Sequence, residues 1–314
     1  MSLSCLSRRR FLTAAATIMA CAFALNPLTK EACAQNPEYQ EIKDVVYKTV
    51  GDRQITLNLY LPIEEGSIVK GRPLLIFLNT GCWRSPGPGD GWLWNLYGAR
   101  SKGFAIASVS HRSIDEPGGT FPAPMEDVRA AVRFLRKHAS EYGYDPKRFA
   151  VMGASSGGHL SLTLGVSDEK TPYNVGDNLD VSGQVQRVID IYGPSDFSDC
   201  FARYPVETID CIYQAFGAPR GEGDASNPGH AALIEKAKAA SPLYYVDANF
   251  APTLIIHGTQ DQVVPLSQSA IIFERMQWAH VRSQFIVTDG GVHSIESIGA
   301  NLHLAREIFE FLGW

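Results

Sequence analysis

The sequence lacks most of the features that would set it apart from ordinary globular proteins. It has no internal repeat, no low-complexity tract and no CxxC pair among its six cysteines, which disfavours zinc and dithiol-redox functions. No metal-ligand cluster or phosphate-binding loop is visible, so nothing indicates a cofactor. Charged residues make up only 19% of the chain and the net charge is -5. Without a basic patch, nucleic acid is not expected as the main partner.

The chain also lacks a hydrophobic run that would span a bilayer comfortably. The apolar run beginning at Phe11 is short and follows three basic residues, Arg8–Arg10. A small-x-small pattern then occurs at Ala32 and Ala34. Basic, apolar and cleavage regions in this order predict a secretory signal over residues 1–34. The arginine pair resembles a twin-arginine signal, which exports folded proteins.

Cleavage after the predicted signal would leave one mature domain over residues 35–314, in the periplasm or the medium. Its net charge would be -8, because four basic residues and one acid are removed from a chain of net charge -5. Two alternatives stay open for the N-terminus: a membrane anchor, and a lipoprotein acylated at Cys21.

Three cysteines remain beyond the signal: Cys82, Cys200 and Cys211. An oxidising compartment permits one disulfide among them. Cys200 and Cys211 are close in sequence and lie in one loop-like insertion, so we predict that they form the disulfide. Cys82 would then be the odd cysteine.

Short apolar runs alternate with helical patterns along the mature chain. Two strand-like segments flank Gly51-Asp52, which is typical of a hairpin. Six later runs have the continuous apolar character of buried parallel strands: PLLIFLNT, FAIASVSH, FAVMGAS, QRVIDIYG, APTLIIHGT and SQFIVTDG. The alternation predicts an α/β fold, with a mostly parallel sheet covered by helices on both faces and antiparallel strands at its N-terminal edge.

Two helical segments and one irregular segment complete the predicted fold. The helix over 124–143 has an apolar face of Val128, Ala131, Val132 and Leu135, with charges on the other face. A second amphipathic helix ends the chain. The stretch 174–242 is less regular, and we predict an insertion over the carboxyl edge of the sheet, where ligands bind in open α/β sheets.

Ser155 is the candidate nucleophile. It is the central residue of Gly153-Ala154-Ser155-Ser156-Gly157, which matches G-x-S-x-G between a strand and a helix. This is the context of a nucleophile elbow, where glycines permit a sharp turn that exposes the serine hydroxyl. Ser156 is the competing serine, but it lies one position too far along. Its backbone N–H would instead help to bind an oxyanion.

The base and the acid are expected after Ser155 in the order acid, then histidine. His293 lies in the glycine-bearing loop DGGVHS after the last strand and is the predicted base. His280, at the end of a helical segment, is expected to be exposed. His303 lies on the amphipathic C-terminal helix and is interpreted as a structural or surface residue.

Asp261 follows the seventh predicted strand and is the predicted acid. The alternative interpretation is that Asp261 only caps the next helix. Asp196, after the sixth strand, is a competing acid. Asp289 beside a glycine is interpreted as a turn residue, and His257 as a packed histidine at a strand end.

The loop after the third predicted strand, LNTGCWRSPGPGDGW, should complete the oxyanion site. Backbone N–H groups of Gly81, Cys82 and Ser156 are the predicted donors. Trp83 and Trp92, with Trp94 nearby, are candidate substrate-binding residues that would form an aromatic wall for a sugar or an aromatic acyl group. Core packing under the loop is the competing interpretation.

At these residues the chain resembles the α/β-hydrolase superfamily of serine esterases. It looks most similar to the bacterial feruloyl/acetyl-xylan esterase type, near the hormone-sensitive-lipase-like carboxylesterases. The resemblance runs from LYLP to GGVHS and is most specific in the block from FPAPMEDV to SSGGHL and in HGTQDQVVP. It implies a triad of Ser155, Asp261 and His293. One departure is that the usual His-Gly-Gly-Gly-Trp loop is replaced by Asn79-Thr80-Gly81-Cys82-Trp83.

The resulting prediction is an exported serine carboxylesterase that uses no cofactor and forms an acyl-enzyme. Its expected substrates are short-chain acyl esters, with acetyl or feruloyl esters of plant polysaccharide as candidates. A peptidase or amidase on the same fold is the nearest alternative. A catalytically silent hydrolase fold used for binding is the alternative from another class, because the oxyanion loop departs from the family pattern.

Overall fold

The computed structural model of the protein describes residues 38–84, 97–198, 200–203, 206–299 and 304–314. They all lie within one compact unit, Asn36–Trp314. Among these residues no helix is long and apolar enough to cross a membrane. The predicted signal over 1–34, Trp92, Trp94 and His303 lie outside the described residues.

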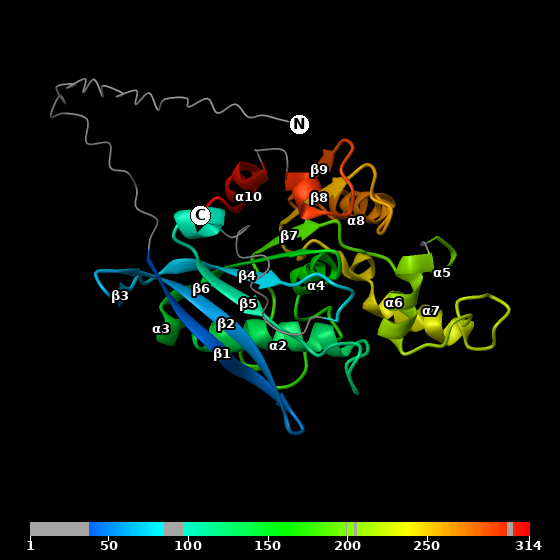
Figure 1. Ribbon diagram of the computed structural model, residues 1–314, viewed down its shortest axis with the longest axis horizontal. Coiled ribbons are helices and arrows are strands. Elements are labelled where there is room, and N and C mark those ends of the chain that lie inside the picture. Colours follow the sequence, from blue (N-terminus) through cyan, green and yellow to red (C-terminus); the bar gives the residue numbers. More distant parts are fainter. Residues whose placement is uncertain (1–37, 85–96, 199, 204–205, 300–303) are drawn as a thin grey trace, which may run out of the picture. The chain divides into compact units, whose positions relative to one another are not determined.

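One nine-stranded sheet runs through the described residues (Figure 1). Its strands lie in the order β1-β2-β5-β4-β6-β7-β8-β9, with β3 paired to β2. Pairing is antiparallel where β2 meets β1, β3 and β5, and parallel from β5 through to β9. The strands are β1 Glu38–Val50, β2 Arg53–Glu64, β3 Ser67–Ile68, β4 Arg72–Leu78, β5 Ala105–Val109, β6 Tyr144–Ala154, β7 Arg187–Ile191, β8 Thr253–Gly258 and β9 Ser283–Thr288. The predicted hairpin and all six predicted parallel strands are confirmed.

Both faces of the sheet are buried, which explains why its parallel strands are continuous apolar runs. In β4, Leu74, Ile76 and Leu78 belong to one apolar core, while Leu75 and Phe77 belong to the other. The period of two along a strand sends alternate side chains to opposite faces, so each position from Leu74 to Leu78 must be apolar.

Helices cover the two faces. Residues of α2, α4 and α8 pack in the larger core, and residues of α1, α9 and α10 pack in the smaller one. The helices are α1 Tyr97–Ser101, α2 Ala123–Lys137, α3 Ala139–Tyr142, α4 Ser156–Gly165, α5 Cys200–Arg203, α6 Val206–Phe216, α7 His230–Ala240, α8 Ser267–Trp278, α9 Ile295–Gly299 and α10 Leu304–Leu312, with a 3-10 turn η2 at Pro242–Tyr245. The predicted insertion contains α5, α6 and α7.

The apolar face predicted for α2 is buried, and Arg129 and Arg133, which the helical pattern places on the other face, are buried as well. The Arg129 guanidinium donates to the carbonyl oxygens of Thr163 and Val166, at 3.1 and 2.8 Å. Arg133 donates to the backbone oxygen of Asp177 at 2.8 Å. A planar group with five donors can be buried where loop carbonyls accept them. Helical periodicity alone does not reveal those distant acceptors.

The predicted disulfide between Cys200 and Cys211 is wrong, because the structure joins Cys82 to Cys211 across 129 residues. Cys200 is buried on α5, whereas Cys211 lies on α6 and faces the loop that follows β4. The Cα atoms of Cys82 and Cys211 are 6.0 Å apart, within the range that a disulfide spans. Proximity along the sequence is therefore a poor guide here, because α6 packs against a loop from the other half of the chain.

Candidate active site

Ser155 lies on a sharp turn between β6 and α4, as the G-x-S-x-G pattern predicts. Its backbone has φ 56° and ψ -121°, a conformation that is strained for a residue with a side chain. Its N–H donates to the carbonyl oxygen of Ile191 at 2.9 Å, which ties the turn to the end of β7. A Cβ on Gly157 would lie 2.4 Å from the carbonyl oxygen of Leu78. The flanking glycine therefore lets the turn pack directly against β4.

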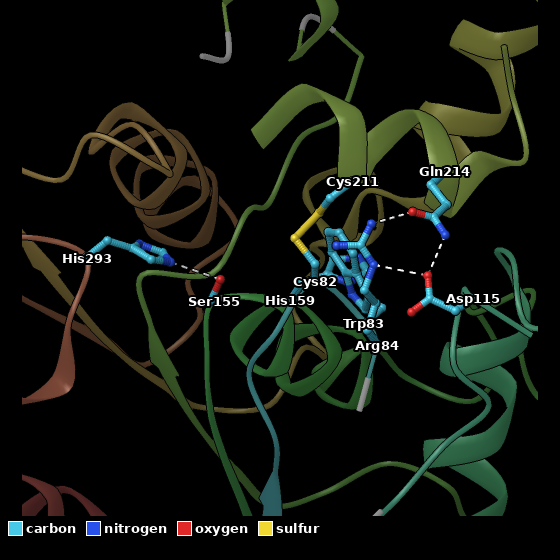
Figure 2. Close-up of a disulfide and its surroundings, with 9 residues drawn as sticks. All are labelled: Cys82, Trp83, Arg84, Asp115, Ser155, His159, Cys211, Gln214 and His293. Atoms are coloured by element: carbon cyan, nitrogen blue, oxygen red, sulfur yellow. Dashed lines mark hydrogen bonds and ion pairs between the residues drawn. A yellow bond between two sulfur atoms is a disulfide. The ribbon is translucent and has the colours of Figure 1, made fainter. Parts of the chain in front are cut away.

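His293 reaches Ser155 from the loop after β9 (Figure 2). The Ser155 hydroxyl lies 3.0 Å from Nε2 of His293, so it can donate a hydrogen bond to an unprotonated Nε2. Nδ1 of the same ring lies 2.7 Å from Oδ2 of Asp261 and donates to that carboxylate. The acid thereby fixes the tautomer that leaves Nε2 free to accept the serine proton.

Asp261, in the loop after β8, combines the two roles that the sequence left as alternatives. Oδ2 accepts from His293, while Oδ1 accepts the backbone N–H groups of Val263 and Val264 at 2.8 and 2.9 Å. Its side chain is fully buried. Burial by itself raises the pKa of Asp261, but hydrogen bonds from His257, His293 and the loop amide of Val264 outweigh burial and hold that pKa below its usual range.

His257 has a contact with the site that the sequence did not reveal. It is a buried strand-end histidine, as predicted, with Nδ1 2.7 Å from the Ser269 hydroxyl. Its Nε2 lies 3.0 Å from the carbonyl oxygen of Val264 and 3.3 Å from Oδ2 of Asp261. Nε2 therefore carries the proton and presents it to the same oxygen that binds His293. The spacing of His257 and Asp261, four residues apart around a strand end, was the available signal.

The other acids and the other histidine considered for the acid and base roles make different contacts or are exposed. One carboxylate oxygen of Asp196 accepts the backbone N–H of Ser198 at 2.8 Å, within its own loop. Asp289 lies in the turn before Gly290, and its carboxylate is 3.3 Å from the Thr259 hydroxyl. His280 is exposed at the end of α8, as predicted.

The loop after β4 contains Gly81, Cys82 and Trp83 and lies beside the serine. All three have positive φ, at 113°, 55° and 55°, and the Arg84 N–H donates to the carbonyl oxygen of Gly81 at 3.0 Å. Cys82 and Trp83 line the same small pocket as Ser155 and Ser156, with a volume of about 30 Å³. Two of the predicted donor residues, Cys82 and Ser156, thus lie beside the nucleophile, and Gly81 directly precedes Cys82 in the sequence.

Trp83 packs beneath the loop as well as lining this pocket. It is buried, and its ring contacts Phe121, His159 and Phe197 in edge-on geometry. The indole N–H donates to Nδ1 of His159 at 3.1 Å, and Nε2 of His159 donates to the carbonyl oxygen of Ala240 at 2.8 Å. Burial lowers the pKa of His159 to about 4, which keeps the ring neutral. The core-packing interpretation of Trp83 therefore describes its position, and its role in substrate binding stays a prediction.

The sheet topology, the strained serine turn and the order of serine, acid and histidine along the chain define an α/β-hydrolase fold. The family model BD-FAE matches residues 57–276, more than half of the 314-residue chain. The chain belongs to the BD-FAE family.

Several relatives and solved structures that resemble the chain carry esterase names, and one relative carries the name of a xylanase. The chain is 28% identical over 229 residues to Esterase LipC of Mycobacterium tuberculosis, covering 72% of this chain and 54% of that protein. It is 27% identical to Endo-1,4-beta-xylanase B of Butyrivibrio fibrisolvens, covering 82% of this chain and 36% of that protein. A solved structure, a truncated carbohydrate esterase from gut microbiota, superposes with TM-score 0.70 at 26% identity, covering 89% of this chain and 97% of that one. The chain spans about half the length of LipC.

Proposed function

We propose that the protein is a serine carboxylesterase with Ser155 as nucleophile, His293 as base and Asp261 as the orienting acid. The observation that carries the proposal is the continuous hydrogen-bonded chain from the Ser155 hydroxyl through both nitrogens of His293 to a buried carboxylate. The three residues come from three separate loops at the carboxyl edge of the sheet. A merely structural histidine would not need to bridge a strained turn with a half-buried serine and a buried acid.

The reaction follows from this geometry. Nε2 of His293 accepts the proton as the Ser155 oxygen attacks the ester carbonyl. Backbone N–H groups of Gly81, Cys82 and Ser156 are the proposed donors to the oxyanion, and such a donor commonly contributes about 3 kcal/mol to the transition state. His293 then gives its proton to the departing alcohol. Water, activated by the same nitrogen, releases the acid from Ser155.

For the substrate, we propose acetyl or other short-chain acyl esters of plant polysaccharide. Two comparisons support a carbohydrate ester: the superposed structure is a carbohydrate esterase, and one relative is a xylanase. The small volume of the pocket beside Ser155 supports a short acyl group over a bulky one.

For localisation, we propose export, with residues 1–34 removed as a twin-arginine-like signal. The disulfide between Cys82 and Cys211 supports an oxidising compartment. N-terminal mass spectrometry of the exported protein tests this: a start at Gln35 agrees with it, and an acylated Cys21 contradicts it.

The activity is tested with p-nitrophenyl acetate and with acetylated xylan, comparing the wild type with folded Ser155→Ala. We expect turnover of both substrates by the wild type and loss of both with the variant. Equal turnover of p-nitrophenyl acetate by the two proteins would mean that Ser155 is not the nucleophile. Turnover of p-nitrophenyl acetate without release of acetate from xylan would agree with the proposed esterase activity but contradict the proposed polysaccharide substrate.

A further inference from the structure

The pocket beside Ser155 has a wall made by the disulfide. Among the described residues, its lining is Cys82, Trp83, Ser155, Ser156, Pro194, Cys211, Ile212, Val263 and Val264. Apart from the two serines, these side chains are apolar, and Cys211 and Ile212 come from α6 of the insertion. The disulfide thus joins the oxyanion loop to α6 at the point where both face the nucleophile.

The position of His293 shows which part of an ester this pocket would hold. His293 must protonate the departing alcohol, so the alcohol lies on the side of Ser155 that faces His293. Figure 2 shows His293 and the disulfide on opposite sides of Ser155, and His293 does not line the pocket. The pocket on the disulfide side therefore faces the acyl group.

The size of the pocket limits that acyl group. A volume of about 30 Å³ has room for about two water-sized groups. The carbonyl oxygen and methyl group of an acetyl ester would fill it. A butyryl chain has two more carbons, and these would meet the sulfur atoms and Ile212.

We propose that the Cys82–Cys211 disulfide is the specificity-determining wall of the acyl pocket and restricts the enzyme to acetyl-sized acyl groups. This inference rests on the proposed esterase function and adds the determinant of acyl length. It assigns to the disulfide a role beyond that of a covalent link between two segments.

A second link between the same segments provides the control. The Arg84 guanidinium is hydrogen-bonded to the side chains of Asp115, at 3.1 Å, and Gln214 of α6. Gln214 also donates to Asp115 at 2.5 Å, and the cluster is exposed (Figure 2). Gln214 does not line the pocket. Gln214→Ala therefore weakens the attachment of the loop to α6 without enlarging the acyl pocket.

The test measures kcat/KM for p-nitrophenyl acetate and butyrate with the wild type, Cys82→Gly/Cys211→Ala and Gln214→Ala. Glycine suits the positive φ of position 82 and keeps the backbone N–H. A disturbed oxyanion loop lowers kcat/KM for both esters together. The ratio of the butyrate value to the acetate value therefore reports the size of the acyl pocket alone. We expect that ratio to rise at least about tenfold in the double variant. In Gln214→Ala it should stay within about twofold of the wild type, because the pocket lining is unchanged.

A folded double variant with the wild-type ratio would overturn the proposal and leave the disulfide a structural link. Should the double variant fail to fold, the wild type and Ile212→Ala are compared with the disulfide intact, because Ile212 lines the same space. Wild-type discrimination against butyrate that persists in Ile212→Ala supports the disulfide as the wall. Absence of that discrimination in the wild type, or its loss in Ile212→Ala, overturns the proposal. A wild type that hydrolyses neither ester would instead reject the proposed function.

Discussion

Replacing Asp261 by asparagine should disable the base while leaving the loop in place. Oδ1 of Asp261 accepts two backbone N–H groups, so the carbonyl oxygen of an asparagine must take that position. Its NH₂ group then points at Nδ1 of His293, which lies 2.7 Å from Oδ2 in the wild type. Nδ1 must become the acceptor, and the proton moves to Nε2. A protonated Nε2 cannot accept the proton of Ser155.

We therefore expect Asp261→Asn to lower kcat by about 10⁴, as a tautomer reversal does in serine hydrolases. That factor corresponds to about 5.5 kcal/mol of lost transition-state stabilisation. Steady-state hydrolysis of p-nitrophenyl acetate near pH 7.5 measures it, with thermal unfolding as a check on folding. Asp196→Asn is the matched control and should change kcat by less than about threefold. A kcat for Asp261→Asn within tenfold of the wild-type kcat would contradict the claim that Asp261 fixes the tautomer of His293.

Three further predictions concern buried polar groups and the disulfide. Burial raises the pKa of Asp190 to about 8. Between about pH 4 and pH 8 the folded protein therefore keeps a proton on Asp190 that the unfolded chain releases. The free energy of unfolding should fall as the pH rises through this range. Asp190→Asn should accordingly leave the free energy of unfolding nearly unchanged at pH 4 and raise it by up to about 4 kcal/mol at pH 7, as measured by urea titration. An equal loss of stability at both pH values would instead show that the Asp190 carboxylate is ionised in the folded protein. Loss of the Cys82–Cys211 disulfide, which closes 129 residues, should cost up to about 5 kcal/mol of unfolding free energy, and an unchanged midpoint of denaturation would contradict this. His257→Phe should lower kcat for p-nitrophenyl acetate several-fold with little change in KM, because the Asp261 carboxylate loses a hydrogen-bond donor; an unchanged kcat would make that contact structural only.

Local patterns in the sequence were enough to predict the sheet and that Ser155, Asp261 and His293 meet at its carboxyl edge. Continuous apolar runs encode strands buried on both faces, and G-x-S-x-G encodes a turn whose geometry depends on its own residues. Ser155, Asp261 and His293 could be selected because each follows a strand, and carboxyl ends of parallel strands meet at one edge.

Contacts between distant segments could not be predicted in this way. Cys82 pairs with Cys211 because the loop after β4 meets α6, and neither residue carries a local signal of the other. Burial of Arg129 and Arg133 likewise depends on carbonyl oxygens that helical periodicity does not describe. Where two partners are far apart in the sequence and neither lies in a recognisable local pattern, only the packed structure identifies the pair.

The most direct test of the central claim is to locate the covalent adduct of methanesulfonyl fluoride, whose methyl group is no larger than that of an acetyl ester. Peptide mass spectrometry of the inhibited protein should place a single methanesulfonyl group on Ser155. The rate of labelling should fall by orders of magnitude in His293→Ala, because the serine loses its base. An adduct on Ser156, or no adduct on well-folded protein, would contradict the assignment of Ser155 as the nucleophile.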